Sequence, residues 1–158
     1  MKLWIIYKDG FVISRIISEA LQDYLENYVD VFVGKASKID PILIAEDHLN
    51  YLIIGDIVNL SVPSLEIQNW TIKFNEMTET ANTYPEFLSG FIISRKGRKY
   101  HSTWKKLITD NIKFKEFYPP ILHLKMDNVN FTTESYINKK IETYSNKIIN
   151  HILNLKIS

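Results

Sequence analysis

The residues best placed to hold an anion are in the stretch from Lys8 to Ser14, which links an apolar run to a helical pattern. In α/β proteins a phosphate often binds at such a junction, because the amides of the first helical turn point at the ligand. The amides from Gly10 to Ile13 would open this helix, and the Lys8 ammonium would add a positive charge. The candidate residues are Lys8, Asp9, Gly10, Phe11, Val12, Ile13 and Ser14.

Asp9 allows two interpretations of this stretch. A carboxylate beside a phosphate dianion costs free energy unless the carboxylate turns away or a cation lies between the two charges. Aspartate just before a helix is also a common N-cap. In that case Asp9 would simply cap the helix, and no ligand would be needed to explain it.

Apolar runs and helical patterns alternate along the whole chain, which predicts the elements that must position this stretch. Apolar runs typical of strands occupy residues 3–7, 29–33, 51–55, 87–94 and 121–126. Helical patterns occupy residues 11–27, 41–48, 65–77, 102–110 and 132–154. The order predicts a three-layer α/β domain over residues 1–158, with a five-stranded, doubly wound parallel sheet.

The composition limits the classes of function. A length of 158 residues with 46% hydrophobic residues suits one domain with a full core. The absence of Cys excludes thiol chemistry and disulfides. A net charge of +1 argues against nucleic acid as a partner, but it allows a local basic patch. No run resembles a signal peptide or reaches the length of a membrane span, so we expect a cytoplasmic protein.

Ligands of such sheets bind outside the carboxyl ends of the strands, where three segments of this chain converge. These segments are residues 8–14, 56–64 and 94–101. Their surroundings read "YKDGFVISRIISEAL", "NYLIIGDIVNLSVPSLEIQNWTIKF" and "GFIISRKGRKYHSTWKKL". Over nearly its full length the chain resembles flavodoxin-like proteins, whose strand order is 2-1-3-4-5. The Asp9-Gly10 pair is similar to the subgroup that includes menaquinone-dependent protoporphyrinogen oxidase.

The resemblance implies FMN as the cofactor. The first segment would hold the FMN phosphate, and the other two would enclose the isoalloxazine ring. The ring-flanking residues would be Ile57, Val58, Asn59, Leu60, Ser94, Arg95, Lys96, Gly97 and Tyr100. The implied function is electron transfer or a small flavin oxidoreductase reaction, which leaves open whether the protein is an enzyme or an electron carrier.

The third segment is strongly basic. No acidic residue occurs from Phe87 to Thr109, and the loop from Arg95 to Lys106 carries most of the positive charge of this region. Such a loop would attract a redox partner protein or another acidic partner. The alternative function is therefore a flavodoxin-like domain that has lost flavin and acts as a binding or regulatory module. A plain solvated surface would explain the same lysines.

A phosphoacceptor receiver domain is a third hypothesis, because receivers share this strand order. They need acids after the first and third strands, a hydroxyl after the fourth and a lysine after the fifth. Asp9, Asp56, Ser94 and Lys125 stand near those places. The single acid after the first strand departs from the receiver pattern, as does the long stretch between the fourth and fifth strands.

Other chemistries find little support in the sequence. No G-x-S-x-G, P-loop or G-x-G-x-x-G motif is present, and the four histidines lack the spacing of zinc ligands. The final helix carries Lys139, Lys140 and Lys147 opposite a row of isoleucines, a pattern typical of an amphipathic helix packed on a sheet.

Overall fold

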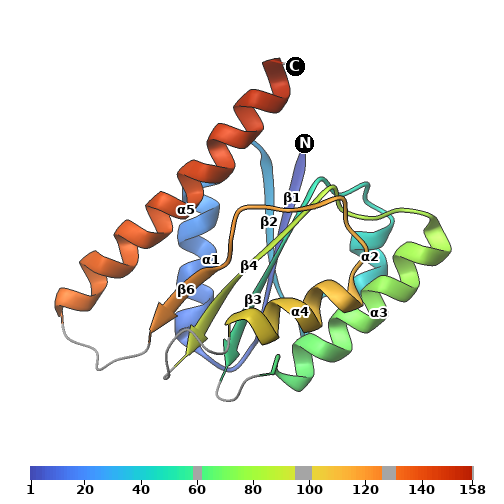
Figure 1. The fold of residues 1–158 in the computed structure, drawn as a ribbon, viewed down its shortest axis with the longest axis horizontal. Helices are drawn as coiled ribbons and strands as arrows, with labels where there is room; N and C mark the ends of the chain where they lie inside the picture. The colour runs from blue at the N-terminus through green and yellow to red at the C-terminus, as the bar shows by residue number, and fades with distance from the viewer. Residues whose placement is uncertain (59–61, 95–100, 126–130, 158) are drawn as a thin grey trace.

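The structure is a computed structural model that describes residues 1–58, 62–94, 101–125 and 131–157 (Figure 1). Its strands are β1 (Lys2–Tyr7), β2 (Asp30–Lys35), β3 (Tyr51–Val58), β4 (Phe87–Ser94), β5 (Glu116–Phe117) and β6 (Leu122–Lys125). Its helices are α1 (Val12–Leu25), α2 (Pro41–Ala45), α3 (Leu65–Ala81), α4 (His101–Asn111) and α5 (Phe131–Ile157).

The strands form one parallel sheet in the order β2-β1-β3-β4-β5, which confirms the predicted order. The predicted fifth strand, residues 121–126, is present as β6, and a short strand that was not predicted, β5, precedes it. β5 pairs with the start of β4 at Phe87 and Leu88, and β6 pairs with the end of β4 from Phe91 to Ser94. Pro119 and Pro120 lie between these two strands, and proline has no amide hydrogen for the ladder, so pairing is interrupted there.

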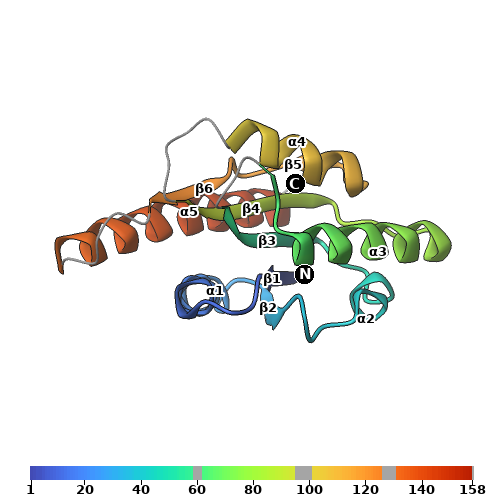
Figure 2. The ribbon, with the colours of Figure 1, turned by 90° about the horizontal axis from the view of Figure 1, so that it is seen from below.

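Helices cover both faces of the sheet (Figure 2). One core lies between the sheet and helices α1 and α5, and it contains Ile5, Ile53 and Ile148. The other lies between the sheet and helices α2, α3 and α4, and it contains Ile54, Phe74 and Trp104. Because side chains of a strand alternate between faces, a central strand between two helical layers must be apolar on both.

Strand β3 is longer than the sequence indicates. All eight of its residues are buried, including Asp56, which pairs in register with Ile92 of β4. The prediction that a loop begins at Asp56 is therefore wrong. The strand continues because Ile57 packs in the first core and Val58 in the second, as the alternation requires.

Within the described residues, no helix combines the length and the hydrophobicity that crossing a bilayer requires.

Candidate functional site

The first segment connects the end of β1 to the start of α1 beside the centre of the sheet. The Lys8 amide donates to the carbonyl oxygen of Gly55 at 2.9 Å, which ties the segment to β3. Gly10 has a φ of +93°, a left-handed conformation that favours glycine. The chain turns there, and α1 begins at Val12 with Phe11 as its N-cap residue.

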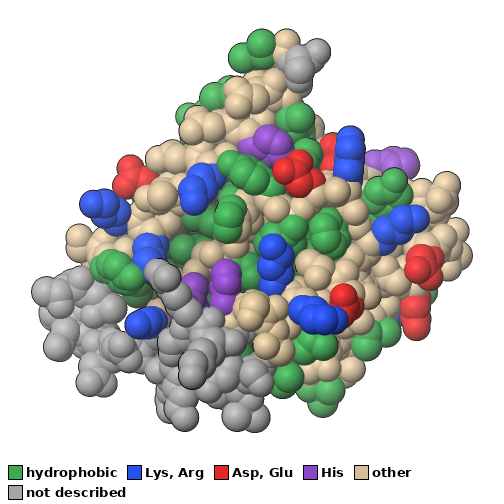
Figure 3. All heavy atoms as spheres, in the orientation of Figure 1, with side chains coloured by type: hydrophobic (Ala, Val, Ile, Leu, Met, Phe, Trp, Pro, Cys, Tyr) green, Lys and Arg blue, Asp and Glu red, His purple; other side chains and the backbone are tan. Residues whose placement is uncertain are grey.

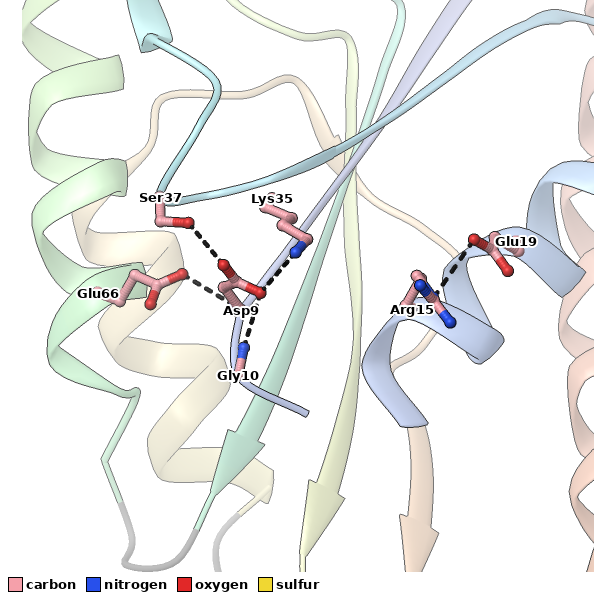
Figure 4. Close-up of polar contacts among 7 residues, drawn as sticks. All are labelled: Asp9, Gly10, Arg15, Glu19, Lys35, Ser37 and Glu66. Atoms are coloured by element: carbon pink, nitrogen blue, oxygen red, sulfur yellow. Dashed lines mark hydrogen bonds and ion pairs between the residues drawn. The ribbon is translucent and has the colours of Figure 1, made fainter. Parts of the chain in front are cut away.

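Asp9 does not cap α1, so this interpretation is wrong. The Phe11 N-cap has an extended backbone, and no side chain of the described residues caps the helix. The Asp9 carboxylate instead pairs with the Lys35 ammonium at 3.0 Å and accepts a hydrogen bond from the Ser37 hydroxyl at 3.1 Å. Figure 4 shows this carboxylate directed toward Lys35 and Ser37, with the α1 residues Arg15 and Glu19 farther away.

The electrostatics of Asp9 favour its charged form. The hydrogen bond from Lys35, followed by that from the Gly10 amide, lowers the pKa of the Asp9 carboxyl below its ordinary value. The same pair raises the pKa of Lys35. The ion pair with Lys35 partly neutralises the Asp9 charge, which lowers the electrostatic cost of an anion near this turn.

Fewer amides face an incoming anion than the sequence suggests. The Asp9 amide donates to Glu66 Oε1 of α3 at 3.0 Å, and the Gly10 amide donates to Asp9 Oδ1 at 2.8 Å. In the structure the Gly10 amide is therefore already engaged by the neighbouring aspartate, and its role toward a ligand stays a prediction. The amides of Val12 and Ile13 remain, since the first turn of an α-helix has no intrahelical acceptors for them.

Ser14 is the first hydroxyl of this turn. Its side chain is fully buried, and its Oγ finds no hydrogen-bond partner in the described part of the chain. A buried hydroxyl without a partner costs roughly 1–3 kcal/mol, so such groups are uncommon in folded proteins and each needs an explanation. Nearby, the Lys8 ammonium lies 5.6 Å from the centre of the Phe11 ring, close to the same helix end. These groups fit an anionic headgroup.

Three residues of this segment, Phe11, Val12 and Ile13, are apolar. Val12 is 64% exposed, and Ile13 packs against the core beneath α1. Phe11 is 41% exposed. The segment thus places exposed apolar side chains around a charged helix end, as a ligand with one anionic and one apolar part would require.

The second segment does not present Ile57 and Val58 as the ring-flanking residues that the sequence predicts. Ile57 and Val58 are 4% and 2% exposed, so they belong to the two cores rather than to an open face beside a ring. The physical reason is the extension of β3, whose last side chains alternate between the helical layers. Asn59 and Leu60 lie outside the described residues.

Asp56 holds the start and end of this second segment together. Its Oδ1 accepts from the Ile57 amide at 2.8 Å, and its Oδ2 accepts from the Ser64 amide and the Trp104 indole, both at 2.9 Å. Burial raises the pKa of the Asp56 carboxyl, and the three donors oppose that rise. A fully buried carboxylate with both oxygens engaged is not an accessible phosphoacceptor, so the receiver hypothesis fails at its central residue.

The third segment begins at Ser94, the last residue of β4. Ser94 is buried, and its Oγ lies 2.6 Å from Nε2 of His123 in β6. Trp104 is a core residue of α4. Arg95, Lys96, Gly97 and Tyr100 lie outside the described residues, so the basic loop stays a prediction.

The sequence did not reveal the residues that surround Asp9. Lys35 ends β2, and Ser37 follows it. Glu66 comes from α3, more than fifty positions further along the chain than Asp9. No local spacing links them, and only the packing of β2 and α3 beside β1 brings them together. Among the residues with described positions, no three His, Asp or Glu side chains are grouped closely enough to hold a metal ion.

Comparison with known proteins finds likeness in structure and none in sequence. No family model and no curated protein matches the chain. A flavodoxin from the domain Archaea matches with a TM-score of 0.62 at 11% identity, covering 94% of this chain and 99% of that one. Flavodoxin 2 from Bacillus cereus matches with a TM-score of 0.69 at 10% identity, covering 96% and 99%.

A larger protein contains the same unit. The Flv1 flavodiiron core from Synechocystis sp. PCC6803 matches with a TM-score of 0.71 at 14% identity, covering 98% of this chain but 36% of that one. Identities this low establish the architecture and leave the ligand undetermined. Together with the strand order and the two helical layers, these likenesses show that the chain has the flavodoxin-like fold.

Proposed function

We propose that the protein binds FMN and serves in electron transfer or a small flavin oxidoreductase reaction. The observation that carries the proposal is the buried hydroxyl of Ser14, which has no partner among the described residues and lies in an α1 turn without a side-chain cap from them. The likeness in fold to flavodoxins from the Archaea and from Bacillus cereus supports the same class of ligand.

In this proposal the phosphate is held by the free amides of α1, the Ser14 hydroxyl and the Lys8 ammonium. Lys35 keeps the charge of Asp9 partly neutralised, and Glu66 anchors the Asp9 amide so that the turn keeps its shape. Asp56 positions the second segment through its bonds to Ile57 and Ser64. When bound, the isoalloxazine ring would supply the electron-transfer chemistry.

The proposal is tested by titrating the purified protein with FMN and with riboflavin, which lacks the phosphate, while following flavin fluorescence. We expect FMN to bind at least about tenfold more tightly than riboflavin, because the phosphate contacts supply part of the free energy. Colourless protein that leaves FMN fluorescence unchanged would contradict the proposal and favour a binding module that has lost flavin.

A matched pair of serine variants locates the phosphate. Ser145 in α5 is also fully buried and also has an unpartnered Oγ among the described atoms, but it lies outside the first segment. Both Ser14→Ala and Ser145→Ala remove an unsatisfied hydroxyl, so neither should lower stability. Only Ser14→Ala should reduce the preference for FMN over riboflavin. Equal preferences in the two variants would remove Ser14 from the site.

A further inference from the structure

A pocket of about 580 Å³ lies along the sheet edge formed by β6, where α5 and the start of α4 enclose it. Its volume is within the range of small-molecule sites. The lining residues outside α5 are His101, Pro120, Ile121, Leu122 and His123. Figure 3 looks onto this face, where histidine and lysine side chains lie among hydrophobic ones.

One face of α5 makes the pocket basic. Lys140 and Lys147 are seven residues apart, so they lie on the same side of the helix, and Lys139 lies beside them. None of the described residues that line the pocket is acidic, and Glu142 of the same helix is not part of the lining. In the described part of the chain, no carboxylate forms an ion pair with any of the three lysines.

Lys140 is held in place at the pocket. Its Nζ donates to the carbonyl oxygen of His123 at 3.0 Å and lies 4.8 Å from the centre of the Tyr136 ring. Two of its interactions thus orient an ammonium group that still has further hydrogens to donate. A peptide strand added at the edge of β6 would have to compete for this carbonyl, which disfavours that kind of partner.

The geometry points to a binding site for a small molecule that carries two or more phosphate groups, such as a nucleoside diphosphate. The lysine ammonium is a compact point charge without the planar fork of arginine, so a site whose permanent charges are lysines favours ligands of high charge density. Seven residues of α5 span roughly 10.5 Å, more than one phosphate covers. Pro120, Ile121 and Leu122 offer the apolar wall that the rest of the ligand would contact.

This site is separate from the one proposed for FMN. The phosphate end of the FMN site uses the turn between β1 and α1, whereas the pocket uses β6 and α5. Among the described residues, the two meet only at the third segment, where His101 lines the pocket and Ser94 Oγ lies 2.6 Å from Nε2 of the pocket residue His123. The two proposals can therefore fail independently.

The test is a titration of the full chain with ADP, and separately with inorganic pyrophosphate, followed by backbone amide NMR in low salt. We expect the largest shifts in β6 and in the α5 stretch from Tyr136 to Lys147. The variant Lys139→Gln/Lys147→Gln should weaken ADP binding about tenfold or more. Both lysines are exposed, and neither ammonium forms an ion pair with another described residue, so the variant should stay folded.

The matched control is Lys113→Gln/Lys115→Gln, which removes the same charge from exposed positions before β5. ADP binding should be nearly unchanged in the control. Four results would overturn the proposal: no shifts at millimolar ADP, shifts confined to the turn after β1, an equal loss in both variants, or binding of a glutamate-rich peptide at this edge without binding of ADP or pyrophosphate.

Discussion

The carboxylate of Asp56 and the indole of Trp104 form a hydrogen bond of 2.9 Å in a place where neither side chain is exposed. The bond joins the end of β3 to α4, and the same carboxylate oxygen also accepts from the Ser64 amide just before α3. One buried group thus ties three elements together next to the second ligand-flanking segment.

Replacing Asp56 with Asn should destabilise the protein. An amide has one acceptor oxygen where the carboxylate has two, so at least one of the three donors would face an NH₂ group. Each buried donor left unpaired costs about 1–3 kcal/mol in the free energy of unfolding. Urea denaturation measures this loss. Asp110→Asn serves as the control, because its exposed pair with Lys106 should contribute less than about 1 kcal/mol.

Asp56 should also give the stability a recognisable pH dependence. Its folded pKa is raised above the ordinary value of 3.8, mainly by burial. At pH values between the ordinary pKa of the unfolded state and the raised pKa of the folded state, the folded state binds more protons than the unfolded state. The free energy of unfolding should therefore fall as the pH rises through this window. The difference in unfolding free energy between the wild type and Asp56→Asn isolates this effect. If the stability advantage of the wild type over Asp56→Asn instead grew as the pH rose, the three hydrogen-bond donors would lower the pKa of Asp56 by more than burial raises it.

The pair of Asp9 and Lys35 should tune the affinity for FMN if the proposed function holds. Asp9→Asn removes a negative charge beside the phosphate and should tighten FMN binding a few-fold. Lys35→Gln leaves that charge unneutralised and should weaken binding to a similar extent, both effects fading in high salt. Riboflavin affinity should stay constant in both variants. If the riboflavin affinity changed as much as the FMN affinity, the Asp9–Lys35 pair would act through the conformation of the turn after β1 and not through the phosphate charge.

The hydroxyl of Tyr144 should contribute measurably to stability. It donates to Ser89 Oγ at 2.7 Å, and Ser89 in turn donates to the carbonyl oxygen of Pro119 at 2.6 Å. Tyr144→Phe breaks the first bond inside the core and should cost about 1 kcal/mol. Thermal or urea unfolding measures the loss. Tyr24→Phe, at a partly exposed position on α1, should leave stability nearly unchanged.

Gly90 of β4 should tolerate no side chain. A Cβ there would approach the Trp104 ring at 2.6 Å and the backbone carbonyl oxygen of Ile54 at 2.7 Å. Because the carbonyl belongs to the neighbouring central strand, it cannot move aside cheaply. Gly90→Ala should therefore lower the free energy of unfolding by about 1–3 kcal/mol. A variant as stable as the wild type would show that β3 and β4 separate more easily than their ladder suggests.

Much of the fold could be predicted from the residues alone. The apolar runs of β1, β3 and β4 indicate strands buried on both faces, and the helical patterns between them indicate parallel pairing. Such signals are local, because a period of two or of 3.6 residues is visible within one segment. The short strand β5 before Pro119 and the extension of β3 to Val58 depend on pairing with β4, and the prediction missed both.

The sequence by itself determined that a charged turn follows the first strand and that this turn opens a helix. Only the tertiary structure decided that Asp9 faces Lys35 instead of capping α1, and that Ser14 has no partner among the described residues. It also decided that three lysines of α5 line a pocket beside β6. The physical reason is that charge pairing and burial depend on distances in space, and segments far apart in the chain come together only when the sheet and its helical layers pack.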